Sequence, residues 1–111
     1  SSDLKAEGKW YEGGTLHQKN GLAWQDSSDA DRLATCADFI AKAHTSGLLK
    51  QSISRNITTV EDTRPYAKEL CDFLNKAFAR EPNPADNAAL YGNQKVSEFA
   101  GLGMAAMGWL K

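Results

Sequence analysis

The chain has few of the residues from which metal centres and covalent catalytic sites are built. Two cysteines and two histidines occur among its 111 residues. Cys36, Cys71, His17 and His44 form no close pair such as C-x-x-C or H-x-x-x-H. The glycines match neither a phosphate loop nor a dinucleotide fingerprint. We therefore expect no metal, no cofactor and no catalytic residues, and we expect that the protein is not an enzyme.

An excess of positive charge and a long hydrophobic run are also missing. Thirteen basic residues stand against fourteen acidic ones, for a net charge of −1. Surfaces that bind nucleic acid usually carry a basic excess, so we expect no nucleic-acid partner. The most apolar stretch, residues 96–110, contains Ser97 and Glu98 and is too short to cross a bilayer, so we expect no membrane span.

What the chain does have is helical periodicity. With 41% apolar and 24% charged residues it has the composition of one compact domain, residues 1–111. Apolar residues recur at spacings of three and four, which predicts amphipathic helices. The predicted helices span residues 28–46, 62–80 and 84–110. We therefore predict an all-α fold, a small bundle of three main helices formed by residues 28–111.

Turn and capping residues mark the ends of these segments. Gly47 is placed to end the first helix, Pro65 lies in the first turn of the second, and Asn83-Pro84 opens the third. The third segment is either one long helix or two helices broken at Gly92-Asn93.

Residues 1–27 are predicted to form an irregular arm that is rich in aromatic side chains. Trp10, Tyr11, His17 and Trp24 fall within fifteen positions of one another. Aromatic residues on loops are enriched at recognition surfaces, so we take these four as the candidate binding residues. The alternative is that the tryptophans anchor the arm to the helical core. The arm either closes over the bundle or docks onto a partner, and if it docks onto a partner we expect Trp10 and Tyr11 to be substantially exposed.

Cys36 and Cys71 lie on the apolar stripes of two different predicted helices. We predict an intramolecular disulfide between them, the alternative being two buried thiols. Disulfides persist in oxidising compartments, and the chain begins at Ser1 without Met, so that either a leader has been removed or the chain was trimmed. We therefore expect a periplasmic or secreted protein.

The first predicted helix reads Leu33-Ala34-Thr35-Cys36-Ala37-Asp38-Phe39-Ile40. This Thr-Cys-x-Asp-Phe opening, with a second cysteine on a later helix, resembles the HdeA-like acid-stress chaperones of bacterial periplasms. In size and helical make-up the chain is also similar to periplasmic immunity proteins that neutralise type VI secretion effectors. The resemblance implies a small, all-helical, exported bacterial protein with one disulfide.

Three hypotheses of function follow. The first is a small exported protein that binds another protein, as an immunity protein, an inhibitor or a chaperone. The second is an accessory subunit of a larger complex, held by the apolar C-terminal helix, through which a dimer is also conceivable. The third is a small enzyme that uses Cys36, with His17 and Asp38, or a pair of carboxylates.

Overall fold

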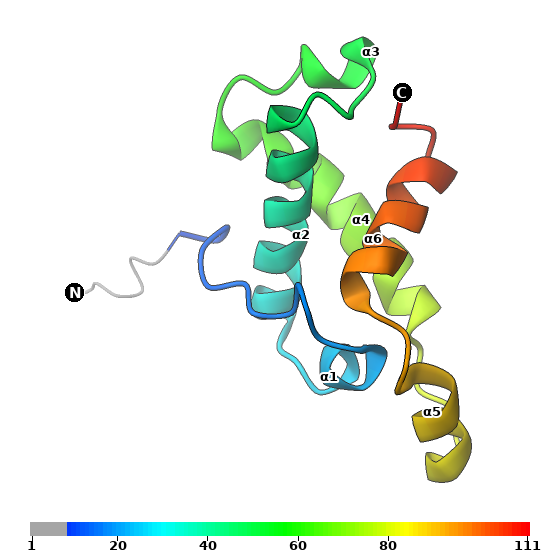
Figure 1. Ribbon diagram of the computed structural model, residues 1–111. Helices are drawn as coiled ribbons and strands as arrows, with labels where there is room; N and C mark the ends of the chain where they lie inside the picture. Colours follow the sequence, from blue (N-terminus) through cyan, green and yellow to red (C-terminus); the bar gives the residue numbers. More distant parts are fainter. Residues whose placement is uncertain (1–8) are drawn as a thin grey trace, which may run out of the picture.

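The computed structural model describes residues 9–111, and over this range the chain is helical with no β-strand (Figure 1). The elements are α1 (Gly21–Gln25), α2 (Asp29–Thr45), α3 (Gln51–Ser54), the 3₁₀ helix η2 (Val60–Thr63), α4 (Arg64–Ala77), α5 (Pro84–Tyr91) and α6 (Val96–Ala106). Two isolated β-bridges, Asn20 with Lys95 and Leu49 with Leu110, tie distant loops together. The predicted all-α class is confirmed.

Local sequence signals correctly mark both ends of α2 and the starts of α4 and α5, but the second predicted helix, residues 62–80, begins as the 3₁₀ helix η2 and ends earlier, at Ala77. The side chain of Ser28 caps α2 by accepting a hydrogen bond from the amide of Asp31. Gly47 follows α2 with a φ of 71°, a conformation that favours glycine. Pro65 lies in the first turn of α4, and the side chain of Asn83 caps α5.

The third predicted segment, residues 84–110, forms two helices, and of the two alternatives the break at Gly92-Asn93 is confirmed, since α5 ends at Tyr91 and α6 begins at Val96. Backbone groups at the break bond to the arm instead of continuing a helix. The carbonyl of Gln94 accepts from the amide of Gly21 at 2.9 Å, and the amide of Val96 donates to the carbonyl of Lys19 at 2.9 Å. The main helices of the bundle are therefore α2, α4 and α6.

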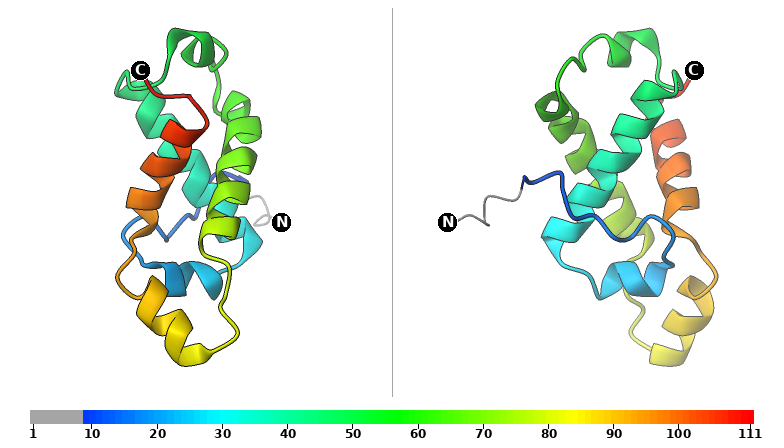
Figure 2. Two further views of the ribbon diagram at one scale, coloured as in Figure 1. Left: turned by 90° about the vertical axis from the view of Figure 1, so that its right-hand side faces the viewer. Right: turned by 60° about the vertical axis from the view of Figure 1, so that its left-hand side comes forward.

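The core lies between α2, α4 and α6, which pack side by side (Figure 2). Its fully buried side chains include Ile40, Leu49, Leu70, Leu74, Phe78 and Val96. Small residues at the contacts, such as Ala37, Ala67 and Ala100, let the helices approach closely. The prediction of one domain therefore corresponds to one contiguous core within residues 9–111.

Trp24 is part of this core, which corrects its assignment as a binding residue. It lies on α1 with only 1% of its surface exposed. Its indole N–H donates to Asn75 Oδ1 at 3.1 Å, and the guanidinium of Arg32 lies 5.5 Å from the ring centroid. A tryptophan so enclosed anchors α1 to the bundle and offers no surface to a partner.

A reciprocal pair of amides joins α1 to α5. Gln25 Nε2 donates to Asn87 Oδ1 at 2.9 Å, and Asn87 Nδ2 donates to Gln25 Oε1 at 2.7 Å. Gln25 also donates to the carbonyl of Phe78, and Asn87 accepts from the amide of Glu81. The pair thus fixes the turn between α4 and α5 against α1.

The arm before α1 lies across α2. The backbone amide of Thr15 donates to Asp31 Oδ1 at 2.7 Å, and the amide of Leu16 donates to Thr35 Oγ1 at 3.3 Å. Gly14 comes so close to α2 that a Cβ on it would lie 2.7 Å from the backbone nitrogen of Thr35. Only a residue without a side chain fits at this position.

We predict that Gly14→Ala destabilises the protein by about 1–3 kcal/mol, because the new methyl group overlaps the backbone of α2. The matched control is Gly101→Ala within α6, where a Cβ meets nothing within 4 Å. That change should stabilise the fold by up to about 1 kcal/mol, the difference in helix propensity between glycine and alanine. Urea unfolding of both variants measures the two effects, and equal stability of the two variants would contradict the docking of the arm.

Candidate protein-binding site

Trp10 and Tyr11 form a cluster with two charged residues that lie far away in the sequence. The indole N–H of Trp10 donates to Glu61 Oε2 at 2.9 Å, and the guanidinium of Arg64 lies 5.1 Å from the ring centroid. Tyr11 meets Trp10 edge to face, with centroids 5.5 Å apart. We call Trp10, Tyr11, Glu61 and Arg64 the aromatic cluster. η2 and the first residue of α4 thus hold the end of the arm.

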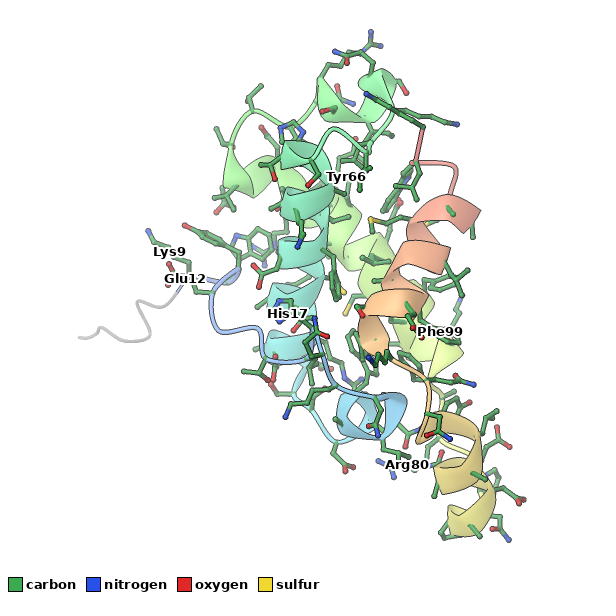
Figure 3. The ribbon with its side chains drawn as sticks, in the orientation of Figure 1. Lys9, Glu12, His17, Tyr66, Arg80 and Phe99 are labelled. Atoms are coloured by element: carbon green, nitrogen blue, oxygen red, sulfur yellow. The ribbon has the colours of Figure 1, made fainter. Side chains whose placement is uncertain are left out.

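The two aromatic rings are half-buried, so the substantial exposure expected of an interface is not observed. Both rings pack against the core, and Glu61 and Arg64 cover part of Trp10. The neighbours Lys9 and Glu12 are exposed and extend away from α2 (Figure 3). The cluster therefore presents part of each ring to solvent, in a fixed orientation, within a rim that carries both signs of charge.

His17 does not belong to the aromatic cluster; its side chain packs against α2. Its Nε2 is 2.8 Å from Asp38 Oδ2, and its ring meets Phe39 edge to face at 5.5 Å (Figure 3). Trp10, in contrast, has its partners on η2 and α4. His17 therefore belongs to the contacts that hold the arm on α2, and it is half-buried there.

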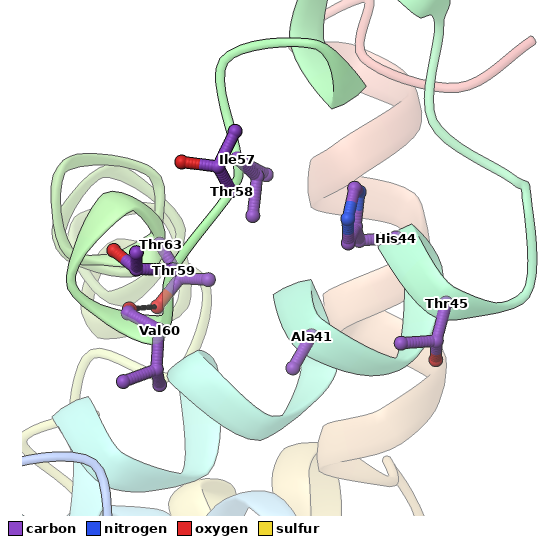
Figure 4. Close-up of a pocket in the computed structure, with 8 residues that line it drawn as sticks. All are labelled: Ala41, His44, Thr45, Ile57, Thr58, Thr59, Val60 and Thr63. Atoms are coloured by element: carbon purple, nitrogen blue, oxygen red, sulfur yellow. Dashed lines mark hydrogen bonds between the residues drawn. The ribbon is translucent and has the colours of Figure 1, made fainter.

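A groove of about 210 Å³ lies between the second half of α2 and the segment that leads into α4 (Figure 4). Its lining residues are Ala41, His44, Thr45, Ile57, Thr58, Thr59, Val60 and Thr63. η2 serves both features, because Glu61 belongs to the aromatic cluster while Val60 and Thr63 line the groove. The groove and the cluster therefore share η2.

The groove is suited to a single apolar side chain. Sites for drug-sized ligands usually enclose about 300–1,000 Å³, which is more than this groove offers. His44 stands in its wall, with Nδ1 held 2.7 Å from the hydroxyl of Ser54 (Figure 4). Ala41 and Ile57 give the lining an apolar character.

Asp62 fixes the loop that forms one wall of the groove. Its Oδ2 accepts hydrogen bonds at 2.9 Å from the amides of Thr58 and Thr59 and from the hydroxyl of Thr58. These bonds, led by the amide of Thr58, lower the pKa of Asp62 to about 2. The carboxylate thus holds two successive backbone amides in place.

Asp31 holds the arm by accepting hydrogen bonds, as Asp62 holds its loop. Burial is the largest influence on its pKa and raises it. Hydrogen bonds from the hydroxyl and amide of Thr15 and from the hydroxyl of Thr35 outweigh burial, and the pKa of Asp31 is lowered below its ordinary value.

The two cysteines lie on adjacent helices, as the sequence predicts, but they are not bonded. Cys36 on α2 and Cys71 on α4 are free thiols, with their side chains 4.2 Å apart. The His17–Asp38 pair of the enzyme hypothesis is present, but Cys36 has no exposed surface and lies beside Cys71. Its thiol is therefore not open to a substrate from solvent.

Within residues 9–111, no group of three or more His, Cys, Asp and Glu side chains is placed to hold a metal ion. None of the helices in that range is both long enough and apolar enough to cross a membrane.

No protein-family model, curated protein sequence or solved structure matches this chain.

Sequence reasoning found Trp10 and Tyr11 but missed Glu61, Arg64 and the groove. Trp10 and Glu61 are 51 positions apart, and the segment around Glu61 reads as a polar connector. The one local signal was the acidic residue Asp62 three positions after Thr59, which is the pattern of a capping box.

We predict that the protein loses stability as the pH falls from about 5 to about 2. The folded state lowers the pKa of Asp31 and Asp62, so their stabilising effect is present above the ordinary pKa and is lost as the pH falls through the folded value. Urea unfolding at several pH values measures this loss. In Asp62→Asn, the free energy of unfolding should depend less on pH at the acid end of this range.

Thr15→Val provides the matched comparison for Asp31, since it removes a hydrogen-bond donor and leaves the carboxylate in place. Like Asp31→Asn, it should reduce the loss of stability at low pH. An unchanged pH profile in both variants would show that the arm does not depend on this contact.

Proposed function

We propose that the protein acts by binding another protein through the aromatic cluster and the adjacent groove. The observation that carries the proposal is the fixed position of Trp10, held by Glu61 and Arg64 beside an apolar groove. Tryptophan, tyrosine and arginine are the residues most enriched at the energetic centres of protein interfaces. An aromatic side chain that is already immobilised loses little entropy when a partner binds.

The geometry suggests how the two parts work together. The exposed parts of Trp10 and Tyr11 offer flat apolar contact, and the groove accepts one apolar side chain of the partner. The surrounding charges are of both signs, with Lys9 and Arg64 near Glu12 and Glu61. We therefore infer a partner surface with a protruding apolar residue and a mixed polar rim.

A rigid site of this kind favours one specific partner, as for an inhibitor or immunity protein. Promiscuous binders use flexible, often methionine-rich surfaces that repack for each ligand. Here Trp10 is held by a hydrogen bond and a cation–π contact, and the groove wall is held by Asp62. The chaperone-like role that the HdeA-like resemblance implies is the less favoured form of the proposal, because a chaperone binds many partners. The proposed location is periplasmic or secreted.

The accessory-subunit hypothesis has one observation in its favour. Leu102, on the outer side of α6, is 57% exposed, and Ala105 and Ala106 beside it are exposed as well. An apolar helix face of this kind also suits self-association into a dimer. Leu102→Glu tests this alternative, because it places a charge in the centre of that face.

We also propose that Cys36 and Cys71 close a disulfide in an oxidising compartment. Their helices pack against each other, and the side chains are already 4.2 Å apart. A disulfide joins sulfurs about 2.05 Å apart, so closure requires only a small movement of the side chains.

Our prediction for the binding surface concerns two variants that change it in different ways. Trp10→Ala removes the anchor and should weaken partner binding by about 2 kcal/mol or more. Ala41→Leu fills the groove from a helical position and should weaken binding at least ~10-fold, because a buried site occupied by its own side chain cannot accept another. The immobilised wild-type chain is used to capture its partner from the native host, and titration calorimetry then gives the affinity of each variant.

Leu48→Ala is the matched control, since Leu48 is 55% exposed and lies outside the cluster and the groove. It should bind as the wild type does. Thermal unfolding of every variant separates loss of binding from loss of fold. If binding survives Trp10→Ala and Ala41→Leu but is abolished by Leu102→Glu, the binding surface is α6.

A second prediction concerns the disulfide. Oxidised protein should be more stable than reduced protein by about 3–4 kcal/mol, since the bond closes a loop of about 35 residues in the unfolded chain. Urea unfolding with and without reductant measures the difference, and Cys71→Ser should show none. Two thiols that stay free after mild oxidation would exclude the bond.

A further inference from the structure

Cys71 opens onto the surface, whereas Cys36 does not. Cys71 lines a hollow of about 340 Å³ on the outside of α2 and α4. The other lining residues are Asp29, Leu33, Lys68, Asp72 and Asn75. Cys36 has no exposed surface, and its side chain lies 4.2 Å from that of Cys71. A reagent in solvent therefore reaches the pair through Cys71.

The charges around the hollow are held in place by the fold. Arg32 donates to the carbonyls of Trp24 and Gln25 at 3.0 Å, and its Nη1 donates to Asn75 Oδ1 at 3.1 Å. Its positive charge thus stands at the edge of the hollow. Lys68 adds a second positive charge, and Asp29 and Asp72 oppose them.

These surroundings make the two thiols different. The neighbouring Cys36 thiol, aided by Arg32, lowers the pKa of Cys71 against the opposing effects of burial, Asp72 and Asp29. The neighbouring Cys71, followed by burial, raises the pKa of Cys36. The thiolate is the reactive form of cysteine in exchange reactions, so the accessible member of the pair is also the more nucleophilic one.

We propose that Cys71 is a site of thiol–disulfide exchange and that Cys36 is its resolving thiol. The proposal rests on the disulfide part of the proposed function and assigns the order in which that bond forms. The ligand class is a small disulfide that fits the hollow over Cys71.

The reaction has two balanced steps. The Cys71 thiolate attacks one sulfur of an external disulfide, the external S–S bond breaks, and one external thiolate leaves as a mixed disulfide forms on Cys71. Cys36 then attacks the Cys71 sulfur, the bond between Cys71 and the external sulfur breaks, and the proton of Cys36 passes to the departing external thiolate. Two protein thiols are oxidised to one disulfide, and one external disulfide is reduced to two thiols.

The resolving step is favoured by position. Cys36 is adjacent to Cys71, so its attack is intramolecular and needs no opening of the helix pair to solvent. The same step run backwards, with a small thiol attacking Cys71, reopens the bond. A small thiol that enters the hollow can thus break the disulfide between α2 and α4 again.

The first test compares the two thiols in the reduced wild-type protein. Limited alkylation with iodoacetamide, followed by peptide mapping, should label Cys71 at least ~10-fold faster than Cys36 in the folded protein. In denaturant the two should react at similar rates, which is the control for intrinsic reactivity. Equal labelling in the folded state overturns the proposal.

The second test traps the intermediate with oxidised glutathione as the probe. Cys36→Ser should accumulate one glutathione on Cys71, Cys71→Ser should stay unmodified, and the wild type should end with an intramolecular disulfide and no glutathione. Intact mass spectrometry distinguishes the three products. Cys36→Ala replaces Cys36→Ser if the buried hydroxyl prevents folding.

The outcomes separate the two proposals. If the wild type closes its disulfide but Cys71→Ser is modified as readily as Cys36→Ser, the assignment of Cys71 as the entry thiol is wrong and the disulfide stands. If the wild type never closes, the disulfide itself is wrong.

Discussion

A stripe of polar side chains on α2 is the contact on which the candidate site depends. Asp31, Thr35 and Asp38 follow one another at spacings of four and three, so they lie on one face of the helix. The arm binds to this face through Thr15, Leu16 and His17. Together with the bonds of Lys19 and Asn20 to the start of α6, these contacts hold the arm to the bundle. Because the pKa of Asp31 is lowered by its bonds to the arm, protonation of Asp31 at low pH weakens this contact.

α2 therefore serves three surfaces at once. Its inner face packs in the core, its polar stripe carries the arm, and its second half supplies Ala41 and His44 to the groove. Cys36 lies beside Cys71 of α4, the helix that carries Arg64 at its first turn. The proposed binding surface is consequently assembled from α2, η2, α4 and the arm, and it forms only when all four are folded together. A site of this kind suits recognition by shape, in which rigid positions matter more than any one reactive group.

Sequence alone predicted the elements that are decided locally. Both ends of α2 follow from Ser28 and Gly47, and the starts of α4 and α5 follow from Pro65 and Asn83; each residue acts within a few positions of its own. The break before α6 could not be decided in the same way, since the hydrogen bonds that stabilise it come from Lys19 and Gly21.

The two tryptophans of the arm show that the candidate site, too, could not be predicted from local sequence. Trp10 and Trp24 both fall in the predicted arm, yet one is half-buried on the surface and the other is enclosed. The difference arises from Glu61 and from Asn75, and each contact spans 51 positions. The groove was missed for a related reason, because its threonine-rich wall has the composition of an ordinary connector. Side-chain chemistry was visible in the sequence, but pairing at long range was not.

The reciprocal amides of Gln25 and Asn87 carry a consequence for how this sequence can change over evolutionary time. Each supplies both a donor and an acceptor to the other, and each also bonds to a backbone group of the α4–α5 turn. Replacing one alone leaves the other with an unmatched, partly buried amide, a cost of about 1–3 kcal/mol. A substitution at either position is therefore selected against unless the other position is substituted as well. Related sequences should vary at these two sites as a pair, even though 62 residues separate them.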